Sequence, residues 1–374
     1  MMPILKSVLL GASILLVTMV NAQMTKKTVP DTTMERVYQE IKTPYKYGMV
    51  VVPEDNGKKI DCPTVFRVGK DWFMSYIVFD GKGYETMLAK SNDLLHWTTT
   101  GKLLSFPKDS TRWDANQRAG YMALQDPQWE GSYALEKYNS KYWMSYIGGR
   151  DKGYEAGDLS IGVANSQASP NTVHEWNVLE TPVLRSNDPD ARWWENKKEY
   201  KSSIIWDKQQ SLGAPFVMFY NANGDSSNGN KKIRWFERIG MALSNDMIHW
   251  KRYLDTPIMQ HPVGITGDAV VQKMGGLWVM FYYGAFWEGR KDAFNRFACS
   301  YDLVNWTDWK GADLIHSSEP YDNKYAHKSY VLKYKGVVYH FYCATNQADQ
   351  RGIAVATSKD LGKTTVGFIQ PNLK

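Results

Sequence analysis

The sequence contains few cysteines for a chain of its length. Of its 374 residues only three are cysteines, Cys62, Cys299 and Cys343. An odd number this small excludes a disulfide framework, and no Cys-x-x-Cys pair provides the spacing of a metal site. We therefore expect the three thiols to pack among the strands of the protein core.

The sequence also lacks a long run of basic residues. Its net charge is +6 and its isoelectric point is about 8.9, but the lysines and arginines are scattered along the chain. Nucleic-acid-binding proteins gather such residues in a stripe or on a groove-binding helix, so we expect no nucleic-acid partner. A modest positive charge is compatible with an acidic substrate.

No apolar run is as long as a membrane span requires. The run at residues 8–20 follows Lys6 and is followed by Ala22, which is the pattern of a secretory signal peptide. We predict that residues 1–22 are this peptide and that cleavage occurs near Ala22. The mature protein is then expected in the periplasm or outside the cell, without a membrane-spanning segment.

What the sequence has in abundance is aromatic strands. Aromatic residues make up 14% of the chain, and a short aromatic segment recurs at residues 73–76, 143–146, 217–220, 279–282 and 339–342. A repeat of this period built on β-hairpins is typical of propeller blades. We predict an all-β fold, a five-bladed β-propeller over residues 46–374, after an N-terminal arm at 23–45. Residues 47–52 or 366–370 would supply the outer strand of the last blade and cover its edge.

Three of the predicted blades end in the pattern Ser-x-Asp-x-x-x-Trp, with the tryptophans at Trp97, Trp250 and Trp306. Serine and aspartate side chains can hold a turn, and the tryptophan can cover a large apolar area at the blade edge. A single active site would not repeat the pattern. We therefore expect these tryptophans to be structural.

Charged residues stand at the starts of the predicted innermost strands, which a propeller brings together around its axis. In blade order they are Asp61; Asp126 and Glu130; Glu195, Glu199 and Lys201; Asp268; and His327 with Lys328. Several carboxylates in one aromatic pocket shift one another's pKa values, so that one can act as an acid and another as a base. Glycoside hydrolysis needs such a pair.

In three features the sequence resembles glycoside hydrolase family 43 and its five-bladed relatives in families 32, 117 and 130. These are Asp61 before a Pro-containing first strand, the hairpin Gly-x-x-Trp-Phe-Met-Ser-Tyr that begins at Gly69, and the Ser-x-Asp-x-x-x-Trp endings. The resemblance covers roughly residues 46–374. It implies inversion by an Asp base, a pKa-tuning Asp and a Glu acid from the first three blades, which correspond here to Asp61, Asp126 and Glu199.

Other residues are candidates for catalysis or substrate binding. Aromatic rings stack on sugars, and arginine binds carboxylates. The resemblance also implies a cation beside an axial histidine, so His327 is a candidate metal ligand, with Ca²⁺ as a structural ion at the axis. No cofactor is expected for catalysis. The further candidates are Glu130, Asp268, His327, Arg118, Lys328, Trp194 and Trp287.

These observations predict a carbohydrate-active enzyme that binds an oligosaccharide or polysaccharide, which can be acidic. We expect a glycoside hydrolase that removes terminal sugars from oligosaccharides of plant or algal polysaccharides by acid/base catalysis. One alternative is a lyase or dehydratase acting on uronic-acid oligosaccharides, with His327 or Tyr121 as the base and Arg118 or Lys328 on the carboxylate. A phosphorylase and a non-catalytic glycan-binding propeller are further alternatives.

Overall fold

The structure, a computed structural model, describes residues 28–225 and 236–369. It is all-β apart from helix α1 (Asp31–Ile41). None of the helices in the described ranges is long and apolar enough to cross a membrane. The predicted signal peptide, residues 1–22, lies outside the described residues.

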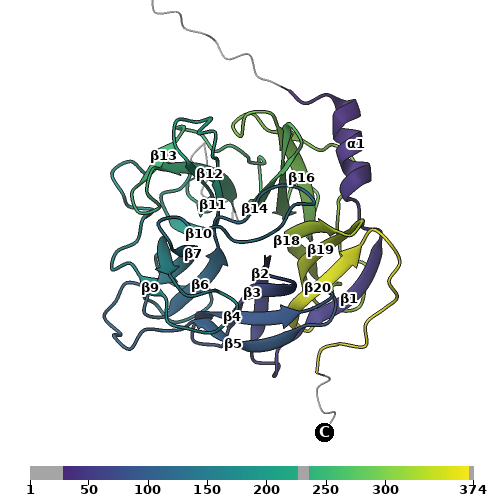
Figure 1. The fold of residues 1–374 in the computed structure, drawn as a ribbon, viewed down its shortest axis with the longest axis horizontal. Coiled ribbons are helices and arrows are strands. Elements are labelled where there is room, and N and C mark those ends of the chain that lie inside the picture. The colour runs from purple at the N-terminus through teal and green to yellow at the C-terminus, as the bar shows by residue number, and fades with distance from the viewer. Residues whose placement is uncertain (1–27, 226–235, 370–374) are drawn as a thin grey trace, which may run out of the picture.

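The described strands form antiparallel groups of four, which Figure 1 shows around a common centre. The first group is β2 (Lys59–Val68), β3 (Asp71–Phe79), β4 (Tyr84–Ser91) and β5 (Thr98–Leu104). The second is β6 (Gln117–Met122), β7 (Tyr142–Gly149), β8 (Leu159–Ser166) and β9 (Asn177–Val178). The third is β10 (Lys198–Trp206), β11 (Phe216–Asn223), β12 (Glu237–Ser244) and β13 (Trp250–Tyr253).

The fourth group is β14 (Ile265–Met274), β15 (Leu277–Ala285), β16 (Ala293–Ser300) and β17 (Thr307–Asp308). The fifth is β18 (Tyr325–Tyr334), β19 (Val337–Thr345), β20 (Arg351–Thr357) and β1 (Tyr45–Val51). Of the two segments expected to supply the outer strand, the N-terminal one does so, because β1 pairs with β20. The last group thus joins the two ends of the domain (Figure 1).

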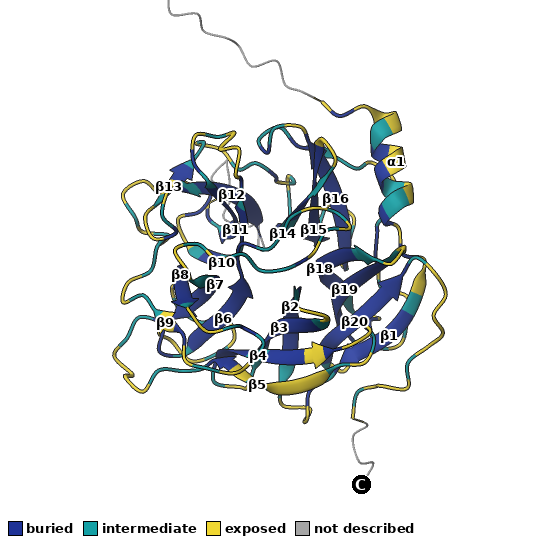
Figure 2. Ribbon diagram, viewed as in Figure 1, coloured by how far each residue is buried: buried dark blue, intermediate teal, exposed yellow. Residues whose placement is uncertain are grey.

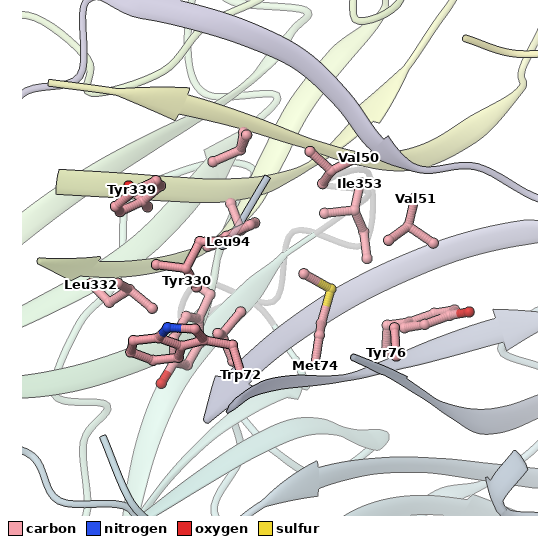
Figure 3. Packing of buried hydrophobic residues seen from close by; sticks show 14 of the residues in the cluster. Val50, Val51, Trp72, Met74, Tyr76, Leu94, Tyr330, Leu332, Tyr339 and Ile353 are labelled. Carbon is pink, nitrogen blue, oxygen red and sulfur yellow. The ribbon is translucent and has the colours of Figure 1, made fainter. Parts of the chain in front are cut away.

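The recurring aromatic segments lie in the second strand of each group, as the repeat predicted. Their side chains fill the interfaces between neighbouring groups. One such cluster, between the first and fifth groups, is shown in Figure 3 and includes Trp72, Met74, Tyr76, Tyr330, Leu332 and Tyr339. Burial of large aromatic and aliphatic side chains on this scale is the main force that holds the groups together.

The predicted N-terminal arm contains helix α1. Its apolar side, with Met34, Val37 and Ile41, is buried against residues of β15 such as Val279 and Phe281, while its other side is exposed (Figure 2). The spacing of these apolar residues by three and four positions is that of an amphipathic helix. The arm therefore packs on the outside of the fold, away from the centre of the ring of strand groups.

The repeated tryptophans have the structural role that their repetition predicted. The indole Nε1 atoms of Trp97, Trp250 and Trp306 each donate a hydrogen bond to the backbone oxygen three residues earlier, at 3.0, 3.0 and 2.7 Å. The serine of each pattern holds the same turn by accepting backbone hydrogen bonds. The three cysteines are free and buried, as expected.

Candidate active site

A pocket opens at the end of the strand groups where their first strands begin. It has a cavity of about 230 Å³ and receives residues from every group. Tyrosines form much of its wall, and charged side chains of both signs reach it. The polar residues that line it are Tyr84, Tyr121, Tyr154, Glu155, Tyr200, Lys201, Asn221, Glu237, Asp268, Tyr283, Tyr325, His327, Lys328 and Arg351.

β-Bulges direct several of these side chains toward the centre. The pairing register of the first strand shifts at the same place in four groups, after Asp61, Glu199, Gly267 and His327. A bulge re-aims the residues within it. The next residue along the chain, Cys62, Tyr200, Asp268 or Lys328, lines the pocket in each case. Three of the four have a positive φ of 50 to 61°.

Asp61 lies behind this pocket and is fully engaged with two cations. Only 1% of its surface is exposed. Its Oδ2 atom accepts hydrogen bonds from Lys328 Nζ at 2.9 Å and from Arg351 Nη1 at 3.0 Å. Burial alone would raise the pKa of Asp61, but Lys328 and Arg351 together hold it well below its ordinary value. A carboxylate held in this way is a weak base.

Glu237 is the first residue of β12, and it lines the pocket. Its side chain is 8% exposed, and its Oε2 atom accepts a hydrogen bond from Asn221 Nδ2 at 2.6 Å. Burial, with the nearby charge of Glu155 as the second cause, raises the pKa of Glu237 to about 8. The carboxyl group is therefore protonated at neutral pH, which is the state that a general acid needs.

Glu155 is the second carboxylate of the pocket, and it lies in the connection between β7 and β8. Its Oε1 atom accepts a 3.5 Å hydrogen bond from Tyr84, and its backbone oxygen accepts one from Lys198 Nζ at 2.6 Å. Burial raises the pKa of Glu155, whereas Lys328 and Arg351 act in the opposite direction. Two carboxylates in different electrostatic surroundings thus share one pocket.

Asp268, His327 and Lys328, three of the residues expected at the axis, also line the pocket. Asp268 accepts a 3.6 Å hydrogen bond from Cys62 Sγ. His327 Nδ1 lies 3.3 Å from the backbone oxygen of Cys343. Burial lowers the pKa of His327 to about 3, so that its ring is neutral. The bulged strands therefore bring together much of what the sequence placed at the axis.

Two other expected acids lie elsewhere. Asp126 follows β6, and its carboxylate accepts hydrogen bonds from the backbone and hydroxyl of Ser132 at 2.8 and 2.6 Å. It lines a separate cavity of about 40 Å³. Glu130 is half exposed and pairs with Lys333 at 3.2 Å. Neither residue lines the pocket that contains Glu155 and Glu237.

Glu199 is buried away from the pocket, beside Glu195, and both carboxylates contact Arg252 at 3.2 Å. The remaining candidates also have partners outside the pocket. Trp194 donates to the backbone of Asp255, Trp287 donates to the backbone of Ile265, and Arg118 pairs with Asp114.

The arrangement of strands and pocket has close counterparts among solved structures. One that is described as a glycoside hydrolase has 53% sequence identity and a TM-score of 0.88, covering 92% of this protein and 99% of that one. The protein belongs to the glycoside hydrolases. The predicted enzyme class is thereby confirmed.

Two further structures resemble this glycoside hydrolase. One, described as a complex of BT0996 and RGII, has 53% identity and a TM-score of 0.89, again covering 92% of this protein and 99% of that one. A thermostable family-43 glycoside hydrolase has 16% identity and a TM-score of 0.56, with 86% and 98% covered, and shares the fold alone. No protein-family model matches the sequence, and neither does any curated protein.

Potential metal ligands gather behind the pocket of this glycoside hydrolase. One ligand atom each from Asp61, His327 and Cys343 lies within 4.8 Å of the others. Ca²⁺ takes six to eight oxygen ligands, whereas this set contributes one carboxylate, one imidazole and one thiol. Lys328 and Arg351 already share the Asp61 oxygen. The donor set therefore does not fit the Ca²⁺ ion that the family resemblance implied.

The two pocket glutamates were not among the residues selected from the sequence. In an antiparallel group, the third strand begins at the same end as the first, so the connection between the second and third strands also reaches the pocket. A signal was present, because Lys-Gly-Tyr-Glu occurs in this connection twice, at residues 82–85 and 152–155. The second copy ends in Glu155.

Proposed function

We propose that this glycoside hydrolase removes a terminal sugar with Glu237 as the general acid and Glu155 as the second catalytic carboxylate. The observation that carries the proposal is that both glutamates line one tyrosine-rich pocket while burial raises the pKa of Glu237 to about 8. The fold that would hold them is a five-bladed β-propeller, with one blade for each group of four strands. The N-terminal sequence would direct the enzyme to the periplasm or outside the cell.

In this mechanism the proton of Glu237 passes to the glycosidic oxygen as the bond to the anomeric carbon breaks. Glu155 stabilises the positive charge that develops on the sugar, and it then activates water or attacks the anomeric carbon itself. Lys328 and Arg351 favour the ionised form of Glu155. After cleavage, the high proton affinity of Glu237 favours its reprotonation for the next cycle.

The shape of the site supports cleavage at a chain end. A cavity of about 230 Å³ is smaller than the sites of drug-sized ligands, which favours one sugar residue over a long glycan segment. Tyr84, Tyr154 and Tyr283 offer rings for contact with the apolar faces of a sugar. The similarity to the complex of BT0996 and RGII makes an RGII oligosaccharide the first substrate class to test.

The test is to incubate the purified protein with RGII oligosaccharides and with a panel of neutral and acidic oligosaccharides, and to follow products by mass. Hydrolysis adds water across the cleaved bond. We expect Glu237→Gln and Glu155→Gln each to lose about 100-fold or more in turnover, while circular dichroism shows a retained fold. Glu136→Gln, which alters an ion pair with Lys208 outside the pocket, serves as the control. Wild-type turnover in both pocket variants would overturn the proposal.

A further inference from the structure

The connection that carries Glu155, residues 150–158, is held by residues from several other strand groups. The backbone nitrogen of Gly153 donates to Lys82 of the first group at 2.8 Å, and Lys198 of the third group donates to the backbone of Glu155. The ring of Tyr154 lies edge-on to Phe79 and Tyr84, with centroid distances of 5.5 and 5.8 Å. The connection therefore belongs in sequence to the second group but contacts its neighbours.

A single guanidinium nitrogen links this connection to the buried charge of Asp61. Nη1 of Arg351 donates to Asp61 Oδ2 at 3.0 Å and lies 2.9 Å from the hydroxyl of Tyr154. Arg351 is itself buried, whereas Tyr154 is 42% exposed. Hydrogen bonds to a charged donor are about twice as strong as neutral ones. Arg351 is thus a strong, directional anchor for an otherwise partly exposed ring.

Lys328 completes the anchor, because it binds the same Asp61 oxygen at 2.9 Å. Asp61 comes from the first group, while Lys328 and Arg351 come from the fifth. A buried carboxylate with two cations on one oxygen has little freedom to move, since breaking either pair would leave a buried charge uncompensated. The position of Arg351 is therefore determined from behind the pocket.

We infer that Asp61, Arg351 and Tyr154 form a relay that positions the carboxylate of Glu155 in the pocket. In this relay Asp61 is a positioning residue that acts through Arg351, and it does not serve as the catalytic base. The inference rests on the proposed function of Glu155. It goes further in assigning roles to Tyr154 and Arg351 and in explaining why an aspartate is buried behind the pocket.

The relay also sets the charge around Glu155. The cations of Lys328 and Arg351 oppose the effect of burial on the pKa of Glu155, while the negative charges of Asp61 and Asp268 reinforce it. Loss of the Arg351 charge is therefore expected to raise the pKa of Glu155. The charged and titratable groups around it from the packed elements are Asp61, Tyr84, Tyr154, Lys198, Tyr200, Glu237, Asp268, Lys328 and Arg351.

Two variants test the relay, with an RGII oligosaccharide as the probe substrate. Tyr154→Phe removes only the hydroxyl and is expected to lower kcat by about 10-fold or more with a smaller change in KM, because small misplacements of a catalytic group are costly. Arg351→Met is expected to lower kcat and to move the acidic limb of the kcat/KM profile to higher pH. A merely structural role would reduce the active fraction without moving that limb.

Matched controls exist for both variants. Tyr76→Phe removes a hydroxyl that bonds to Thr99 at 2.7 Å outside the pocket, and Arg296→Met removes a buried arginine paired with Asp313. Both are expected to keep the wild-type pH profile. If Arg351→Met fails to fold, Tyr154→Phe decides, since Tyr154 is partly exposed.

The relay and the proposed function can fail separately. An inactive Glu155→Gln enzyme together with wild-type kcat in Tyr154→Phe would overturn the relay alone. A wild-type pH profile in folded Arg351→Met would also overturn it. An active Glu155→Gln enzyme would overturn the proposed function instead.

Discussion

Replacement of Glu237 by glutamine should separate the activity of this enzyme from its stability. Burial raises the pKa of Glu237 from its ordinary value of 4.5 to about 8. Between these pH values the folded state binds the proton more tightly than the unfolded state, so the free energy of unfolding declines as the pH rises through this window. The effect is absent below the lower value and complete above the upper one.

The gap between the two pKa values corresponds to an upper limit of about 5 kcal/mol. Glutamine has no charge to desolvate and retains an oxygen that can accept the hydrogen bond from Asn221 Nδ2. Glu237→Gln is therefore expected to be inactive but more stable than the wild type, by an amount that grows from pH 5 to pH 8.

Urea unfolding of both proteins at several pH values measures this difference. Glu136→Gln serves as the surface control, and its stability difference from the wild type should change much less with pH. A stability difference for Glu237→Gln that does not depend on pH would refute the reasoning about burial. Wild-type turnover in this variant would refute its role as the acid.

Three other predictions concern the surroundings of the pair. Lys201 lines the pocket, is 3% exposed, and its Nζ has no hydrogen-bond partner within the described ranges; Lys201→Met should raise KM by about 10-fold or more, because a charged donor to a sugar oxygen is lost, as steady-state kinetics would show. Glu199→Gln and Asp126→Asn should keep kcat near the wild-type level, since neither residue lines the pocket, and a large loss in either would support the roles implied by family 43. Incubation with EDTA should leave activity unchanged, because Lys328 and Arg351 occupy the carboxylate of Asp61, and a loss that Ca²⁺ restores would contradict this.

Much of the fold could be predicted because its signals are local. The aromatic segments recur where second strands form, and the turn patterns before Trp97, Trp250 and Trp306 recur at the ends of the groups. Large apolar side chains at regular intervals must be buried wherever they occur, so the repeat alone indicates the architecture. The enzyme class could be predicted for a related reason, since the blade pattern is shared with known glycoside hydrolases.

The pocket was harder to predict because it depends on contacts between groups. Asp61 and Glu199 both precede a bulge in a first strand, yet one meets Lys328 and Arg351 while the other meets Arg252. Their positions in the repeat are equivalent, but their partners come from distant parts of the sequence. Spacing along a strand contains no information about those partners.

The sequence by itself thus determined the all-β class, the repeating strand groups and the buried aromatic core, because side-chain size and periodicity act within each hairpin. Only the tertiary structure decided which carboxylates share the pocket and which one retains its proton. That outcome depends on bulge geometry, on the β7–β8 connection that carries Glu155, and on the burial of Glu237. A pKa reflects the whole surroundings of a group, and several strand groups create those surroundings together.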